Sequence, residues 1–307
     1  FSDVVVQIIP QGYDNCGFIV WNSKSEKNEC VVIDVYDSKA FVVELKTLSK
    51  VPVAVLSTHW HWSVVKLLKC SRDHCGGNHG LITEYPNLAV YAGKREPVSC
   101  ATIRVDHGDD IEVADLNFSV EFVPGHTGGQ VVYRLHVPPG DSDCLFTGDF
   151  LFVGGTGRLF EGSDARLLSS LMAVRSWHPD CLIFPGHDFA KENLEFALTV
   201  EPDNVELTGK YVDVCDRRLA RLPAMPTCLK DEFDYNPFLR LGEESVVNGL
   251  ENLGYTVPPP RTHKGRARLD PDVVDFNRKV DVLRVLRKAR EDYETKKRKQ
   301  KVTKISA

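Results

Sequence analysis

The segment Val53-Ala-Val-Leu-Ser-Thr-His59-Trp-His61 runs from an apolar stretch directly into two histidines that are separated by one residue. Its first part has the composition of a buried β-strand. Side chains at positions i and i+2 of an extended chain lie on the same face, so His59 and His61 are predicted to be neighbours. Taken alone, the pair fits a metal site and a structural role equally well.

The same arrangement recurs at three further places. An apolar, strand-like stretch leads into histidine or aspartate beside glycine in Val123-Pro-Gly-His126, Leu145-Phe-Thr-Gly-Asp149 and Ile183-Phe-Pro-Gly-His187. Each of these is by itself more typical of a simple turn. In open α/β sheets, however, the loops at one edge converge on a common site. The four segments together therefore predict a site of imidazoles and carboxylates, which are ligands suited to zinc, iron or manganese.

Short β-branched stretches alternate with helical patterns before residue 190, which predicts a layered α/β protein. The predicted strands are Val4–Ile9, Gly17–Trp21, Cys30–Val35, Val53–Ser57, Leu88–Ala92, Asn117–Val123, Val131–Val137, Cys144–Thr147 and Cys181–Phe184. The predicted helices in this part are Ala40–Leu48 and Asp164–Trp177.

From Lys191 onward the strand pattern gives way to helical patterns. The predicted elements are helices over Lys191–Val200, Val205–Arg221 and Val273–Tyr293, and a proline-punctuated connector over Pro223–Phe238. We therefore divide the chain into a sheet-based domain, residues 1–190, and a helical C-terminal region, residues 191–307. The basic run Lys296–Lys301 is predicted to be a solvated, frayed terminus, the alternative being a nuclear or membrane-surface signal.

The composition is that of an ordinary globular protein, with 307 residues, 42% hydrophobic, 26% charged and a net charge of −5. This balance does not indicate nucleic-acid binding, and no apolar run reaches the roughly 20 residues of a membrane-spanning helix. The nine cysteines form no close pair of the zinc-finger or redox type, which favours reduced thiols. Because the chain begins at Phe1, we expect a fragment or a processed form, located in the cytoplasm or in mitochondria.

The histidine and aspartate segments resemble the metallo-β-lactamase superfamily, and within it the glyoxalase II (hydroxyacylglutathione hydrolase) family. Thr58–His61 with Asp73-His74 is similar to the motif Thr-His-x-His-x-Asp-His, and the three other segments follow in the family's order. The resemblance continues through Gly157–Gly162, Glu192–Ala197 and Tyr235–Arg240. Within the family, Cys144–Asp149 and Leu168–Leu171 are similar to the branch associated with paroxysmal dyskinesia in animals.

The resemblance implies an αββα sandwich with a helical C-terminal substrate-binding region, and a monomer that hydrolyses S-lactoylglutathione to glutathione and lactate, a step of methylglyoxal detoxification. It implies two divalent metal ions, zinc or iron or both, which activate water. The implied ligands of the first ion are His59, His61 and His126; those of the second are Asp73, His74 and His187, with Asp149 shared by both. Asp73 and Asp149 are also the implied catalytic residues. The implied contacts to the glutathione thioester are Arg158, Phe160, Phe189, Arg287 and Arg290.

Several of these positions depart from the family pattern. Phe160 and Phe189 stand where glyoxalase II has tyrosines, so two hydroxyl contacts are missing. Arg158 and Arg290 replace lysines, which keeps the charge but changes the geometry of hydrogen bonding. These changes put the affinity for S-lactoylglutathione in question.

The largest departure is a ten-residue interruption, Ser63–Arg72, inside the first motif. Without it, Thr58–Trp62 would run directly into Asp73-His74, as the family pattern requires. An insertion between two intact halves favours retained intron sequence or a splice variant over functional adaptation.

Two other functions stay open. A persulfide dioxygenase shares this fold and uses a single iron, but lacks a helical extension such as the one containing Tyr235–Arg240. A weakly catalytic regulatory paralogue is the second alternative, disabled by the insertion over residues 63–72. Metal analysis separates the three, because they predict two metals, one iron or none.

Overall fold

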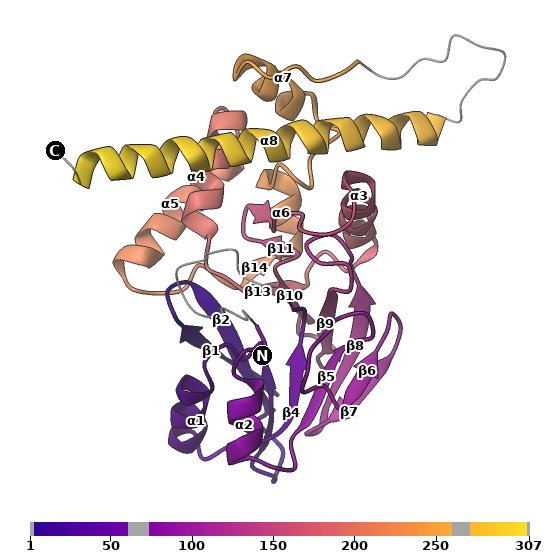
Figure 1. The fold of residues 1–307 in the computed structure, drawn as a ribbon, viewed down its shortest axis with the longest axis vertical. Helices are drawn as coiled ribbons and strands as arrows, with labels where there is room; N and C mark the ends of the chain where they lie inside the picture. The colour runs from indigo at the N-terminus through magenta and orange to yellow at the C-terminus, as the bar shows by residue number, and fades with distance from the viewer. Residues whose placement is uncertain (1–2, 61–73, 260–270, 306–307) are drawn as a thin grey trace.

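The computed structural model describes residues 3–60, 74–259 and 271–305 and contains two mixed β-sheets packed face to face, which lie below the C-terminal helices in Figure 1. The first sheet has the strand order β1 (Val4–Gln11), β2 (Asn15–Asn22), β3 (Glu29–Ile33), β4 (Val51–Ser57), β5 (Ala89–Gly93) and β6 (Ile103–Val105). The second has the order β14 (Thr227–Cys228), β13 (Leu182–Pro185), β10 (Cys144–Gly148), β9 (Val131–His136), β8 (Leu116–Phe122) and β7 (Asp110–Val113). A small hairpin of β11 (Leu151–Phe152) and β12 (Gly155–Thr156) follows β10.

The space between the sheets is filled by aromatic and aliphatic side chains. The ring of Phe18 on β2 lies 5.2 Å from that of Phe146 on β10 and 5.6 Å from that of Phe184 on β13, measured between centroids. Tyr133 on β9 is fully buried and donates a hydrogen bond to the carbonyl oxygen of Ser57, at 3.1 Å. This donation joins the second sheet to the end of β4, where the histidine segment begins.

Helices cover the outer face of each sheet. On the first sheet, α1 (Ser38–Thr47) and α2 (Asn78–Glu84) bury Phe41 and Leu81 in one cluster with Val55 and Val90. On the second, α3 (Asp164–Ala173), which is followed by a 3-10 turn η1 (Val174–Ser176), buries its leucines against Leu145. The order helix, sheet, sheet, helix confirms the predicted αββα sandwich.

In the described part of the C-terminal region, five further helices lie around one end of the sheets. They are α4 (Ala190–Val200), α5 (Val205–Leu219), α6 (Leu229–Tyr235), α7 (Glu244–Asn252) and α8 (Pro271–Ile305). In Figure 1, α8 crosses this end as one long rod. Its residues Val282, Leu283 and Leu286 share a core with Leu167 and Leu171 of α3, so α8 is packed against the sandwich and does not stand apart. The predicted division of the chain near residue 190 stays a prediction.

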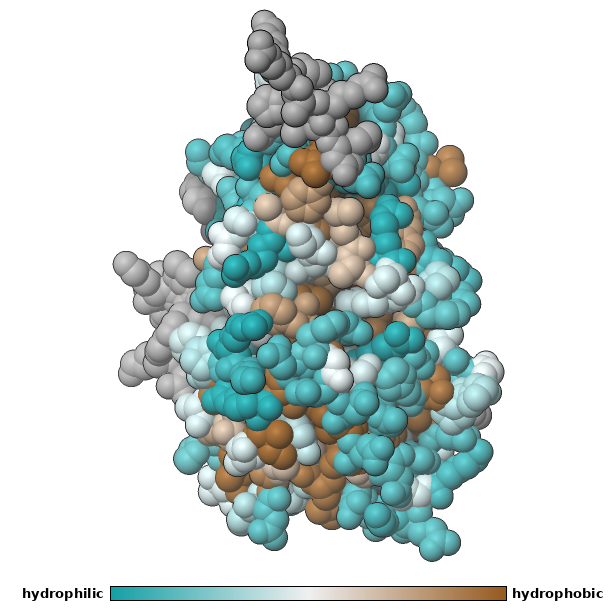
Figure 2. Space-filling view, turned by 90° about the vertical axis from the view of Figure 1, so that its right-hand side faces the viewer, coloured by the Kyte–Doolittle hydropathy of each residue, from teal (hydrophilic) through white to brown (hydrophobic). Residues whose placement is uncertain are grey.

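The surface is mainly polar. In Figure 2 hydrophilic residues cover most of the face shown, and hydrophobic residues gather in its lower part. Among the residues that the structure describes, no helix combines the length and the apolar character needed to cross a membrane.

The structure corrects two predictions for the C-terminal region. The connector predicted over Pro223–Phe238 contains β14 and α6, a seven-residue helix that ends just before Pro237. The basic run Lys296–Lys301, predicted to be frayed, is helical, because α8 continues to Ile305. Its first turns are tied to α4, where the ammonium group of Lys297 pairs with Glu195.

Smaller corrections concern the sheets. The strand predicted to reach Val35 ends at Ile33, because Asp34 turns the chain with a φ of 54°. The short strands β6 and β7, and the helices α2 and α7, were not predicted from the sequence. The strands β6 and β7 and the helix α2 are too short for a periodic pattern to identify them. The nine-residue helix α7 has buried residues Val246, Gly249 and Leu250 at helical spacing, a pattern that the prediction overlooked.

Glu232 on α6 is a buried carboxylate that joins this helix to the hairpin between β11 and β12. It accepts hydrogen bonds from the hydroxyl of Tyr235 at 2.6 Å, from the amide of Asn236 at 2.9 Å and from the backbone N–H of Gly154 at 2.9 Å. Burial raises the pKa of Glu232 from 4.5 to about 7. Since the folded state holds the proton more tightly, Glu232 contributes stability that is fully present below pH 4.5 and lost as the pH rises through 7.

Glu232→Gln is therefore expected to leave the free energy of unfolding nearly unchanged at pH 4 and to increase it by roughly 3 kcal/mol at pH 8. The amide mimics the protonated acid, because its oxygen still accepts from Gly154 and Asn236 while its nitrogen donates to Tyr235. Denaturant unfolding at both pH values measures this. Glu201→Gln is the matched control: Glu201 is buried but ion-paired with Arg240 at 3.0 Å, so its amide should destabilise the protein at pH 8. Equal pH dependence in the wild type and Glu232→Gln would show that Glu232 does not take up this proton.

Candidate metal centre

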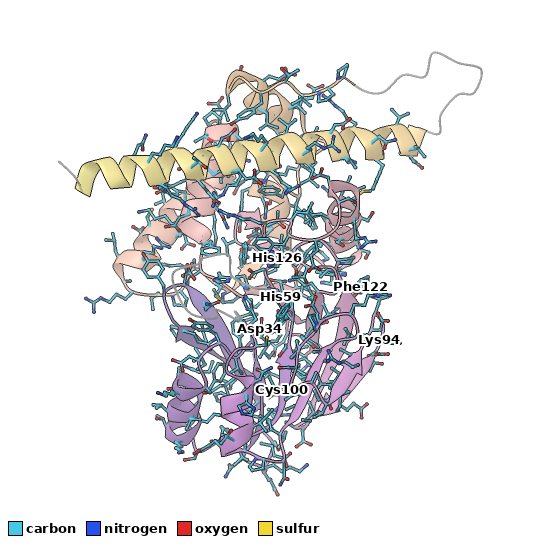
Figure 3. All side chains as sticks on the ribbon, in the orientation of Figure 1. Asp34, His59, Lys94, Cys100, Phe122 and His126 are labelled. Carbon is cyan, nitrogen blue, oxygen red and sulfur yellow. The ribbon has the colours of Figure 1, made fainter. Side chains whose placement is uncertain are left out.

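Four loops at the same end of the two sheets bring their histidines and aspartate together. His59 follows β4, His126 follows β8, Asp149 follows β10 and His187 follows β13, and all four side chains are buried. His74, just before α2, joins them and is 1% exposed. In Figure 3 the labelled His59 and His126 lie close together, near Asp34, below the helical region. Five of the seven predicted ligands thus form one cluster, whereas His61 and Asp73 lie outside the described residues.

Asp149 lies at the centre of this cluster, with a pair of imidazoles facing each carboxylate oxygen. Its Oδ2 is 3.4 Å from Nε2 of His126 and 4.0 Å from Nε2 of His59. Its Oδ1 is 3.2 Å from Nε2 of His74 and 3.4 Å from Nε2 of His187. The ligand atoms of each triad, His59–His126–Asp149 and His74–Asp149–His187, lie within 4.8 Å of one another.

The second ring nitrogen of each of the four histidines has a partner that fixes the orientation of the ring. The Nδ1 partners are the hydroxyl of Thr58 at 3.0 Å for His59, Asp34 at 3.2 Å for His74, the carbonyl oxygen of Arg158 at 2.8 Å for His126 and Asp14 at 3.1 Å for His187. With Nδ1 held in this way, each Nε2 is directed at Asp149. Metal-binding histidines are usually oriented by such outer contacts.

Asp34 supports two sides of the cluster and was not predicted as a site residue. Its carboxylate accepts hydrogen bonds from the backbone N–H and the hydroxyl of Thr58, both at 2.8 Å, and also contacts His74. The sequence did contain a signal, because Asp34 directly follows an apolar strand, as Asp149 does. The β-branched pattern of Cys30–Val35 instead placed it inside a predicted strand.

Glu96 is a second supporting carboxylate that the sequence did not reveal. It is 3% exposed and accepts hydrogen bonds from the N–H of Trp60 at 2.7 Å, the hydroxyl of Thr127 at 2.5 Å and the N–H of Gly129 at 3.0 Å. Burial raises the pKa of the Glu96 carboxyl. Because Trp60 follows His59 and Thr127 follows His126, Glu96 ties the two histidine loops together. It lies in an irregular loop after β5, where no pattern identifies it.

Charge is strongly coupled inside the cluster. Burial alone would raise the pKa of Asp149, but His187, His74 and His126 hold it well below its usual range. Burial disfavours the charged form of His187, yet Asp149 and Asp14 raise the pKa of this imidazole to about 9. The buried carboxylate of Asp149, together with Asp14, is therefore stabilised by positive charge in the cluster. A divalent cation held by neutral imidazoles supplies that charge, so the donor set fits a metal.

The glycines of the site segments allow the loops to approach this closely. A Cβ at Gly186 would lie 2.5 Å from Cε1 of His74 and 3.1 Å from Oδ1 of Asp149. A Cβ at Gly157 would lie 2.0 Å from the carbonyl oxygen of Asp149 and 2.8 Å from Nδ1 of His126. Either side chain would displace a member of the cluster, so the close approach of the loops requires glycine at these two positions.

The residues predicted to contact substrate lie at different distances from the cluster. The ring of Phe189 stacks on that of His187, with centroids 4.6 Å apart, and the ring of Phe160 meets His126 edge-on at 5.0 Å. Arg287 pairs with Asp164 at the start of α3. Arg158 and Arg290 both pair with Glu294 on α8. The two aromatic side chains thus contact the cluster directly, whereas the arginines are engaged by carboxylates of the chain.

Comparisons with known protein families cover nearly the whole chain. Residues 10–187 match the family model of the metallo-beta-lactamase superfamily, and residues 188–293 match that of the hydroxyacylglutathione hydrolase C-terminus. The fold is similar to that of ETHE1 from Myxococcus xanthus, with a TM-score of 0.55, 24% identity and coverage of 83% of this chain and 93% of that one. It is also similar to that of the BLEG-1 B3 metallo-beta-lactamase, with a TM-score of 0.55, 21% identity and coverage of 76% and 99%.

Curated relatives are similar over most of their length. The cytoplasmic hydroxyacylglutathione hydrolase of Arabidopsis thaliana is 31% identical over 264 residues, which is 85% of this chain and 96% of that protein. The hydroxyacylglutathione hydrolase of Microcystis aeruginosa is 36% identical over 242 residues, covering 78% of this chain and 90% of that protein. The sandwich, the histidine–aspartate cluster and these matches lead to one conclusion: the chain belongs to the hydroxyacylglutathione hydrolase family, within the metallo-β-lactamase superfamily.

Proposed function

We propose that this protein is a metal-dependent hydrolase of glutathione thioesters, which converts S-lactoylglutathione to glutathione and lactate. The observation that carries the proposal is the pairing of imidazoles around Asp149, found in a chain whose relatives are hydroxyacylglutathione hydrolases. The match of residues 188–293 to the C-terminal model of that family favours this function over a persulfide dioxygenase.

We assign His59, His126 and Asp149 to one metal ion and His74, His187 and Asp149 to a second. His61 and Asp73, outside the described residues, are proposed to complete the first and the second set, with Asp73 and Asp149 as catalytic residues. Zinc or iron bound there would polarise the thioester carbonyl and bring the ionisation of water toward neutral pH. Asp34, Asp14 and Glu96 serve this chemistry by holding the imidazoles in place.

The chain's own side chains explain why a thioester suits the site. A thiol has a pKa of about 8.5, so a thiolate leaves without a dedicated proton donor, whereas an amine requires one. Phe160 and Phe189 flank the histidines and provide apolar surface beside the acyl group. Arg158, Arg287 and Arg290 are proposed to face the carboxylates of the thiol.

Metal analysis combined with a hydrolysis assay tests the proposal. The purified protein is expected to bind two metal ions per chain and to release glutathione from S-lactoylglutathione. One bound iron with oxygen consumption on a persulfide would identify a dioxygenase. Absence of both metal and hydrolysis would identify a regulatory paralogue.

Replacing both Arg287 and Arg290 by alanine is expected to raise KM for S-lactoylglutathione and to change kcat by no more than a few-fold. This is the result of losing contacts that bind substrate and transition state equally. Steady-state kinetics measure both constants. Because the two arginines also tie α8 to Asp164 and to the carbonyl oxygen of Glu192, thermal unfolding must accompany the assay.

The matched control for this double variant is Arg284→Ala. Arg284 also pairs with Asp164, at 3.0 Å, but is not among the proposed substrate contacts. A collapse of kcat with unchanged KM in the double variant would give α8 a role other than substrate binding.

The finer placement of the protein is also a proposal. We infer membership of the animal branch associated with paroxysmal dyskinesia from Cys144–Asp149 and Leu168–Leu171, and we infer a monomer in the cytoplasm or mitochondria. The Arabidopsis relative is a cytoplasmic enzyme by name, which supports the first compartment. Sedimentation of the purified protein and imaging of the tagged full-length chain test these points.

A further inference from the structure

A carboxylate of the chain lies between two of the arginines proposed to bind substrate. Glu294 on α8 accepts a hydrogen bond from Nε of Arg290 through Oε1, at 3.0 Å. Its other oxygen, Oε2, pairs with the guanidinium of Arg158. The side chains of Glu294 and Arg290 are 24% and 18% exposed, so this contact is partly shielded from solvent.

This contact is linked to the metal centre through Arg158. The carbonyl oxygen of Arg158 contacts Nδ1 of His126 at 2.8 Å, and Phe160, two residues further on, packs against the same imidazole. The side chain of Arg158 therefore connects Glu294 to the backbone carbonyl that orients His126, a proposed metal ligand.

The arginines already have partners within the chain. Arg290 donates to the carbonyl oxygen of Glu192 at 2.7 Å as well as to Glu294, and Arg287 pairs with Asp164. A thiol carboxylate that binds Arg158 or Arg290 must either displace the carboxylate of Glu294 from the arginine or lie close to it, with two negative charges side by side. Like charges brought together at a partly buried site weaken binding, and such repulsion is a common source of specificity.

We propose that Glu294 is a specificity-determining residue that disfavours thioesters whose thiol presents a carboxylate to Arg158 and Arg290. Glutathione thioesters are then bound more weakly than the arginines alone would allow, whereas the binding of thioesters whose thiol has no negative charge at this position is unaffected. The inference rests on the proposed thioester hydrolysis and narrows the class of thiol. Glu294 contacts none of the reacting groups, so its effect falls on binding and not on the rate of bond cleavage.

Glutathione also carries an ammonium group, which Glu294 could bind instead. The two roles predict changes of opposite sign when the charge of Glu294 is removed. Removal of a repelling carboxylate strengthens the binding of an anionic thiol, whereas removal of an ammonium partner weakens it.

Equilibrium binding to the full chain distinguishes the two roles without depending on turnover. The probes are S-methylglutathione, a thioether that cannot be hydrolysed, and its diethyl ester, in which both carboxylates are neutral. Glu294→Gln is expected to bind S-methylglutathione about tenfold more tightly than the wild type and to bind the diester equally well. Isothermal titration calorimetry measures both constants.

Asp292→Asn is the matched control, because it removes the same charge from the same helix. Asp292 faces Lys288 at 2.7 Å and Tyr255 at 3.1 Å and contacts neither Arg158 nor Arg290. This variant is expected to bind both probes as the wild type does. Thermal unfolding of each variant establishes that α8 remains docked.

The results separate this inference from the proposed function. Unchanged or weaker binding of S-methylglutathione by Glu294→Gln overturns the inference, as does failure of every variant to bind either probe. If binding tightens as expected but no variant hydrolyses S-lactoylglutathione or its diester, charge selection by Glu294 stands and thioester hydrolysis is wrong. If hydrolysis occurs, KM for S-lactoylglutathione is expected to fall in Glu294→Gln with kcat unchanged.

Discussion

Asp149→Ala is expected to lower bound metal below one equivalent per chain and to reduce kcat/KM for a thioester by more than about 10³-fold, roughly 4 kcal/mol. A single carboxylate faces both pairs of imidazoles, at 3.2–4.0 Å, so its loss affects both halves of the cluster. It also leaves buried imidazoles without the negative charge that the fold places between them. Atomic spectroscopy of the dialysed protein and a thioester assay measure the two effects.

Two further variants show whether the loss of metal and activity in Asp149→Ala is specific to this carboxylate. Asp149→Asn keeps the shape of the side chain but replaces one oxygen by an amide nitrogen, so it should impair one metal more than the other. Asp180→Ala removes an exposed carboxylate that pairs with Lys230, and it should change neither metal content nor rate. If Asp149→Ala retains the wild-type metal content, the shared role that we assign to Asp149 is wrong.

Deleting Ser63–Arg72 is expected to raise metal occupancy and thioesterase activity together, by roughly 10–100-fold in metal affinity. The segment lies outside the described residues, but His59 before it and His74 after it, which the structure does describe, meet at the site. The rings of His59 and His74 lie 4.3 Å apart between centroids, so the chain leaves and returns at one place. Extra loop length costs only about 1 kcal/mol in closure entropy. The main penalty should therefore fall on the placement of His61 and Asp73.

A second variant separates the length of the insertion from its composition. Replacing Ser63–Arg72 with ten glycines and serines keeps the loop length but removes Val64, Val65, Leu67 and Leu68. If only the deletion restores metal, loop length is the cause; if both restore it, the apolar side chains are. If neither changes metal or activity, the insertion is harmless. If either variant binds metal but does not hydrolyse the thioester, the proposed substrate is wrong.

The sequence predicted the cluster because its parts carry a local signature. His59, His126, Asp149 and His187 each follow an apolar strand, and parallel neighbours such as β10 and β13 bring the ends of strands together. The αββα fold followed from the same strands and from their resemblance to a known family. These predictions depended on short-range patterns, which a sequence displays directly.

The supporting carboxylates Glu96 and Asp14 could not be predicted, because their contacts are long-range. Glu96 reaches Trp60 and Thr127 across 36 and 31 positions of sequence, and Asp14 reaches His187 across 173. Such contacts depend on how the two sheets are paired, which local patterns do not determine. The ion pairs of Arg158 and Arg287 were missed likewise, because their partners, Glu294 on α8 and Asp164 on α3, are 136 and 123 positions away in the sequence. Arg290 and Glu294, by contrast, are four residues apart on α8, a spacing that the sequence displays.

The long rod of α8 has a consequence for how this protein changes over evolutionary time. The helix carries Arg287, Arg290 and Glu294, whereas every described member of the metal cluster comes from loops that follow the strands or precede α2. Substitutions on one surface of α8 can therefore alter the electrostatic filter for thiols while the hydrolytic machinery stays intact. The part of selectivity that lies on α8 is therefore inherited separately from the chemistry, so a new substrate preference can arise there without passing through an inactive ancestor.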